Sequence, residues 1–165
     1  MVELASRSAA RHPPEVPVRT KRWNDPKDDD DGYRLLICRY RPRGVPKSEE
    51  TWDAWCKALA PSEELHAAAY GKTGPALAFH EYERRFLEEM TRQKYWIEGF
   101  AAHVRRGDTI TLLCSSACVD PARCHRTIVK RLLEEAAAPH GAAEAKSEAS
   151  EAKARNDKVV RRRPL

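Results

Sequence analysis

Two short apolar runs, far apart in the 165-residue sequence, most constrain the fold of this chain. Residues 33–40 (YRLLICRY) and residues 109–114 (TITLLC) have the length and composition of strands buried on both faces of a sheet. Between them, residues 76–106 carry apolar side chains at three- and four-residue steps, which predicts a helical stretch interrupted near residues 91–94. Strands joined through helices lie parallel and are connected by right-handed crossovers, so the pattern predicts an α/β domain.

Two further helices are predicted beside this pattern. Residues 48–60 place apolar side chains at helical spacing, and Pro61 ends the segment. Residues 123–138 form an amphipathic closing helix. The expected architecture is a single three-layer α/β domain with a mostly parallel sheet flanked by helices.

The net charge of +5 is concentrated at the two ends of the chain. Residues 1–22 contain five Lys and Arg against two Asp and Glu, and residues 141–165 contain seven against four. The intervening residues carry 18 against 19. Both ends also lack an apolar stripe, which is typical of disorder. We therefore expect a disordered N-terminal tail (1–20), one domain (21–139) and a disordered basic C-terminal tail (140–165).

Composition excludes several classes of protein. No run approaches the roughly 18 apolar residues of a membrane span, and the N-terminus lacks the apolar region of a signal peptide. Five cysteines are an odd number in a chain large enough to fold without disulfides, which favours free thiols. We therefore expect a cytoplasmic protein without a membrane partner. No Gly-rich phosphate loop, nucleophile elbow or dinucleotide fingerprint is present.

The carboxyl ends of the two predicted strands run into unusual loops. In open α/β sheets ligands bind at these ends, which makes residues 39–44 and 114–126 the expected site if the strands are neighbours. Cys124 lies near the start of the closing helix, where free backbone N–H groups and the helix dipole attract anions and lower a thiol pKa. Arg123, His125 and Arg126 add positive charge or a titratable donor.

The leading hypothesis is a site for a phosphate-bearing ligand, a nucleotide or a nucleic acid, in which thiolate chemistry could occur. No cofactor is expected in this interpretation. Its candidate catalytic residues are Cys124, Cys114 and His125. Its candidate ligand-binding residues are Arg39, Arg43, Arg123 and Arg126.

Two alternatives remain open for the same turn. Cysteine sulfur and imidazole nitrogen are zinc ligands, and the spacing C-x3-C-x5-C-H supplies four of them in a zinc-binding or redox-responsive regulatory protein. These candidate metal ligands are Cys114, Cys118, Cys124 and His125. In a purely structural interpretation, Asp120 caps the closing helix and the cysteines pack as small core residues.

Four segments resemble a known family. The stretches KRW…DGYRLLICRYRPRG, DAWCKALAPSEEL, YERRFLEEM and GDTITLLC…DPARCHR occur in this order between about residues 21 and 135. In order and in the terminal CHR they are similar to the domain-of-unknown-function family 488, the YeaO-like proteins. The resemblance implies a compact α/β domain and no particular reaction. This chain departs from the family pattern at Cys38, at Arg41 and in a longer loop that contains Cys118.

Overall fold

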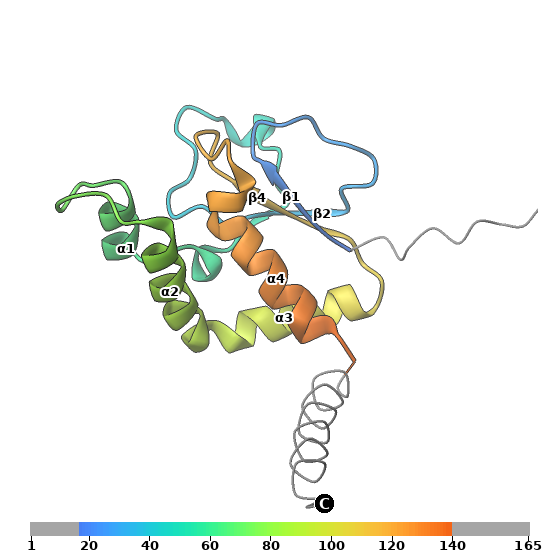
Figure 1. Cartoon of the computed structure of the whole chain (residues 1–165). Coiled ribbons are helices and arrows are strands. Elements are labelled where there is room, and N and C mark those ends of the chain that lie inside the picture. Colours follow the sequence, from blue (N-terminus) through green and yellow to red (C-terminus); the bar gives the residue numbers. More distant parts are fainter. Residues whose placement is uncertain (1–16, 140–165) are drawn as a thin grey trace, which may run out of the picture.

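The structure, a computed structural model, describes residues 17–139 and contains a four-stranded parallel sheet (Figure 1). The strands are β1 (Val18–Arg22), β2 (Tyr33–Leu36), β3 (Ala54–Trp55) and β4 (Ile110–Cys114), and their order across the sheet is β1-β4-β2-β3. Ile110 is in register with Val18 on one side and with Tyr33 on the other. The predicted α/β class with a parallel sheet is confirmed, and β2 and β4 are neighbours.

The ordered domain begins earlier than predicted. Residues 18–20, assigned to the N-terminal tail from the nearby prolines, belong to strand β1. The amide of Ile110 donates to the carbonyl of Pro17 over 2.8 Å, and Val18 is 1% exposed. Pairing with the central strand β4 orders these residues, although their local sequence has no apolar stripe. The predicted tail residues 1–16 and 140–165 lie outside the described residues.

Within residues 17–139, four α helices accompany the sheet. They are α1 (Glu63–Ala69), α2 (Phe79–Met90), α3 (Lys94–Arg105) and α4 (His125–Ala137). A 3-10 turn at Thr91–Gln93 separates α2 from α3, as the interruption in the apolar spacing predicts. Within residues 17–139, no helix is long and apolar enough to cross a membrane.

The predicted helix at residues 48–60 is wrong. This segment contains two 3-10 turns and the short strand β3, which lies parallel to β2. The amide of Asp53 donates to the carbonyl of Arg34 over 2.8 Å, and the amide of Cys56 donates to that of Leu36 over 2.9 Å. The exposed edge of β2 thus obtains backbone partners, and this non-local pairing wins over the helical spacing of the side chains.

The two faces of the sheet are covered differently. Leu35 and Leu112 belong to a core cluster that includes buried residues from each of the four α helices, which gather on one side of the sheet (Figure 1). Leu36 and Leu113 belong to a second cluster with Trp52. The sheet therefore lies between a helical layer and a layer of loops and 3-10 turns, so the second outer layer contains no α helix among the described residues.

A cluster of charged residues, Lys21, Asp31 and Arg34, connects the loop before β2 to the sheet. The guanidinium of Arg34 forms an ion pair with Asp31, and both side chains are 0% exposed. Lys21 of β1 lies 2.7 Å from a carboxylate oxygen of the same aspartate. Burial alone would raise the pKa of Asp31, but hydrogen bonds from Lys21, the Asp28 amide and Arg34 outweigh burial and lower this pKa. This carboxylate therefore remains ionised inside the protein.

Candidate cysteine-rich site at the carboxyl edge of the sheet

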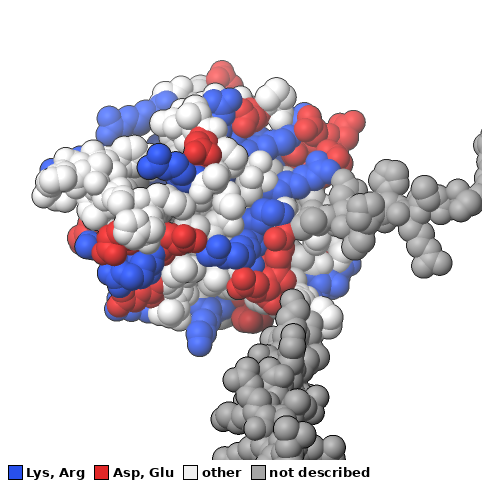
Figure 2. All heavy atoms as spheres, viewed as in Figure 1, with Lys and Arg blue, Asp and Glu red and all other residues white. Residues whose placement is uncertain are grey.

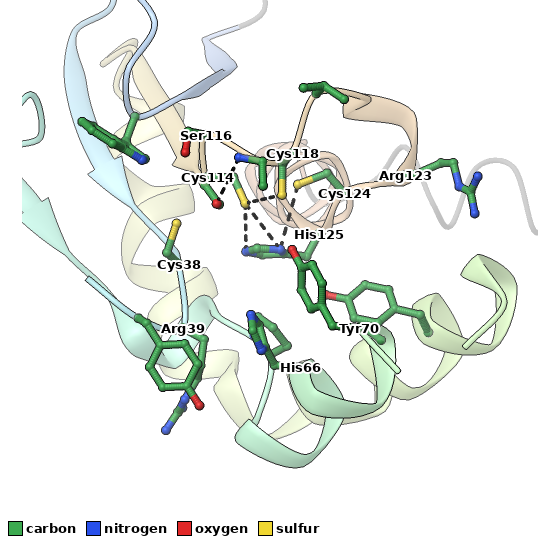
Figure 3. A pocket seen from close by; sticks show the side chains of 18 of the residues that line it. Cys38, Arg39, His66, Tyr70, Cys114, Ser116, Cys118, Arg123, Cys124 and His125 are labelled. Carbon is green, nitrogen blue, oxygen red and sulfur yellow. Dashed lines mark hydrogen bonds between the residues drawn. The ribbon is translucent and has the colours of Figure 1, made fainter. Parts of the chain in front are cut away.

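The loops after β2 and β4 line one cavity of about 960 Å³, as their predicted proximity requires. The loop after β2 contributes residues 39–43, and the loop after β4 contributes residues 115–120. His66 of helix α1 and Tyr70, the residue that follows this helix, line the cavity from the opposite side (Figure 3). The candidate site therefore lies at the carboxyl ends of two adjacent parallel strands.

Three cysteine sulfurs gather on one wall of this cavity. The Sγ atoms of Cys114, Cys118 and Cys124 lie within 4.8 Å of one another, and the thiol of Cys114 donates to the sulfur of Cys118 over 3.3 Å. Cys114 ends β4, Cys124 immediately precedes α4, and Cys118 lies in the loop between them (Figure 3). All three are free thiols, and only Cys118 is partly exposed.

The His125 ring lies against the sulfurs in a defined tautomer. Its Nε2 is 2.8 Å from the carbonyl oxygen of Ile37, which can only accept a hydrogen bond, so Nε2 carries the proton. The unprotonated Nδ1 then faces Cys114 at 3.8 Å and Cys124 at 4.0 Å. Burial lowers the pKa of His125, which favours the neutral ring.

The three thiols of the cluster differ in the direction of their pKa shifts. Hydrogen bonds from the thiols of Cys114 and Cys124 hold the pKa of Cys118 well below its usual value. The pKa of Cys114 is raised by its hydrogen bond to Cys118, and the pKa of Cys124 is raised by its hydrogen bonds to Cys114 and Cys118. The lowered pKa of Cys118 favours ionisation of this thiol over ionisation of its two neighbours. The pKa of Cys124 is raised rather than lowered as expected at a helix terminus, because its thiol keeps its proton and donates a hydrogen bond to neighbouring sulfurs.

The predicted ligand-binding arginines fall into three groups. Arg43 and Arg123 line the cavity and have no carboxylate partner within residues 17–139. Arg39 also lines the cavity, but its guanidinium is 3.0 Å from Glu63 and points away from the sulfurs (Figure 3). Arg126 does not line the cavity. Arg126 is 4% exposed and donates to the carbonyl of Cys118 over 3.2 Å. It therefore stabilises the loop after β4 through this buried hydrogen bond.

The start of α4 has no side-chain cap. Its N-cap residue is Cys124, which makes no capping hydrogen bond. Asp120 instead caps the short 3-10 turn Pro121–Arg123, where its carboxylate accepts from the Ala122 amide over 2.9 Å. The structural interpretation that placed Asp120 at the α4 terminus is therefore wrong. No side chain therefore caps the first turn of α4.

The family of this chain follows from its sequence comparisons. Residues 18–137 match the family described as the "Active DUF488-N3 subclade", a range that contains every strand and α helix of the structure. The chain belongs to the DUF488 family.

Related proteins give the same family. The DUF488 domain is 34% identical over 100 residues to "Uncharacterized protein YeaO" of Escherichia coli (strain K12), which covers 60% of this chain and 83% of that protein. It is 36% identical over 76 residues to "Uncharacterized protein Rv3073c" of Mycobacterium tuberculosis (strain ATCC 25618 / H37Rv), covering 46% of this chain and 62% of the relative. No solved structure matches this chain.

Some residues of the DUF488 cavity were not identified from the sequence. Among them are His66, Tyr70 and Lys72. His66 contacts Tyr70, four residues later, with ring centroids 4.7 Å apart. The four-residue spacing of His66 and Tyr70 was the available signal, but it gains meaning only once α1 is known to face the cysteine loop.

Proposed function

We propose that the cavity binds a small phosphate-bearing ligand, with a nucleotide as the leading class, and that the Cys118 thiolate is its reactive group. One observation carries the proposal: Cys118 and three cations without carboxylate partners in residues 17–139 line the same cavity. The cations are Arg43, Lys72 and Arg123. Cations without an ion-pair partner retain their hydrogen-bonding capacity for an anionic ligand.

The distribution of charge favours a small ligand over a long nucleic acid. Residues 17–139 contain 21 Lys and Arg against 19 Asp and Glu, so the domain has no large excess of positive charge. Basic and acidic groups are interspersed on the face shown in Figure 2. Binding a nucleic-acid backbone requires a continuous basic groove, whereas a single phosphate group needs only a few cations in one place.

Removing the cations should weaken phosphate binding. We expect ribose 5-phosphate to raise the melting temperature, and Arg43→Ala and Arg123→Ala each to weaken its affinity about tenfold, the effect of losing one charge-assisted hydrogen bond. Titration calorimetry and thermal melting measure both quantities. Arg92→Ala is the matched control, because Arg92 is exposed and does not line this cavity. Equal losses in Arg92→Ala, or no stabilisation of the wild type, would contradict the proposal.

A second candidate function is zinc binding by the same cluster. The observation that favours it is the His125 tautomer: Nδ1 presents its lone pair to two of the three sulfurs, while Nε2–H is held by a backbone carbonyl. Zinc-binding histidines usually have their second nitrogen fixed in this way. Cys114, Cys118, Cys124 and His125 would then supply a Cys3His set.

Zinc content separates the two candidates. If zinc is bound, the purified protein should hold one equivalent of metal, and a chelator should lower its melting temperature, because the loss of a structural metal removes binding energy from the folded state. Elemental analysis and thermal melting provide the measurement. Cys56→Ala serves as the control, since Cys56 is buried and is not part of the cluster. Well-folded protein without metal, and with melting insensitive to chelator, would exclude zinc.

A further inference from the structure

Exposed aromatic rings line the cavity beside its cations. Tyr40 is 52% exposed and Tyr70 is 55% exposed, although both belong to the cavity wall. The His66 ring lies between them, with centroids 5.3 Å from Tyr40 and 4.7 Å from Tyr70. Three adjacent rings thus form an aromatic wall, here defined as Tyr40, His66 and Tyr70.

The aromatic wall alternates with positive charge along the chain. Tyr40 is flanked by Arg39 and Arg41, with Arg43 three residues later, and Lys72 follows Tyr70 by two residues. All of these side chains line the cavity. Burial, with a contribution from nearby Lys72 and Arg39, lowers the pKa of His66 and favours a neutral ring. Uncharged rings next to cations suit a ligand that has both a flat apolar part and an anionic part.

We propose that the ligand of this cavity is a mononucleotide whose base stacks on the aromatic wall while its phosphate contacts Arg43, Lys72 and Arg123. This inference rests on the proposed phosphate-binding function and adds a binding position for the base. The cavity volume of about 960 Å³ lies at the upper end of the range typical of small-molecule sites, about 300–1,000 Å³. The near balance of charge in residues 17–139 favours one nucleotide over a strand.

A comparison of ligands with and without a base tests the proposal. We expect AMP or GMP to bind the full-length protein about tenfold more tightly than ribose 5-phosphate, since the stacking of one base contributes roughly this factor or more. Tyr40→Ala and Tyr70→Ala should each remove most of this advantage and leave the affinity for ribose 5-phosphate unchanged. Tyr40→Phe and Tyr70→Phe should retain the advantage, because phenylalanine preserves the ring face. Titration calorimetry measures each affinity.

Tyr95→Ala provides the matched control. Tyr95 is 82% exposed on α3 and does not line the cavity, so its removal should change neither affinity. If ribose 5-phosphate and the nucleotides bind with equal affinity, the proposed base-binding position is overturned, whereas the proposed phosphate binding is not. Binding of neither probe would overturn both proposals. An oligonucleotide that binds at least a hundredfold more tightly than AMP, with strong salt dependence, would overturn the assignment to a mononucleotide.

Discussion

Cys118 should react with iodoacetamide at pH 6 at nearly the rate it shows at pH 8. The hydrogen bonds from Cys114 and Cys124 hold the pKa of Cys118 well below its usual value, so this thiol is ionised at both pH values. An ordinary cysteine with a pKa of about 8.5 would slow by roughly a hundredfold over this interval. Site-resolved mass spectrometry of alkylated protein, with a chelator present, measures the rate. A tenfold fall for each pH unit below 8 would contradict a thiolate at Cys118.

Two variants test the origin of the effect. Cys114→Ala removes the thiol that donates to Cys118 over 3.3 Å, so the pKa of Cys118 should rise and its rate at pH 6 should fall at least tenfold. Cys56→Ala removes a buried thiol outside the cluster and should leave the rate unchanged. If Cys114→Ala behaves like Cys56→Ala, the hydrogen bond does not set the pKa. Slow reaction of all three cluster thiols until chelator is added would indicate metal.

The two central strands of the sheet were predictable, because each is marked by a continuous apolar run in the sequence. The runs at residues 33–40 and 109–114 contain the central strands β2 and β4, since a strand covered on both faces must be apolar throughout. Their parallel pairing follows from the helices between them, and it brings both loops to one cavity. The location of the candidate site therefore follows from elementary features of α/β sheets.

The chemistry within the site was less predictable, because it depends on contacts between separate segments. A helix terminus predicts a low thiol pKa at Cys124, yet hydrogen bonds among the three thiols raise the pKa of Cys124 and lower that of Cys118. The aromatic wall includes His66 of α1 and Tyr70, the residue that follows this helix, and both are remote in sequence from the cysteine loop. Spacing along the chain does not specify which of several neighbouring sulfurs donates and which accepts.

Arg34 gives another example of a tertiary effect. It is a charged residue within the apolar run 33–40, which is predicted as a strand buried on both faces. In the structure its guanidinium is completely buried and is paired with Asp31, three residues earlier. A buried charge is tolerated only with a partner and hydrogen bonds, so the energetic importance of Asp31 becomes visible only in three dimensions.

Asp31→Ala should lower the free energy of unfolding by about 3–5 kcal/mol, the usual cost of leaving a buried charge without its partner. The substitution would remove the carboxylate that pairs with Arg34 and Lys21. Urea unfolding measures the change. Asp30→Ala is the matched control in the same loop: this carboxylate pairs with Arg19 but is 62% exposed, so its loss should lower the stability much less than Asp31→Ala does. Equal effects of the two variants would show that the buried pair contributes no special stability.

The double variant Asp31→Ala/Arg34→Met and the pH dependence separate the buried charge from simple loss of packing. Removing both charges should recover part of the stability lost in Asp31→Ala, because no uncompensated guanidinium then remains. The pKa of Asp31 is lowered in the folded protein, so its contribution is present above the unfolded value of about 3.9 and is lost as pH falls through the folded pKa. Wild-type stability should therefore fall more steeply below about pH 4 than that of Asp31→Ala. Parallel acid profiles would mean that the carboxylate is not preferentially ionised in the folded state.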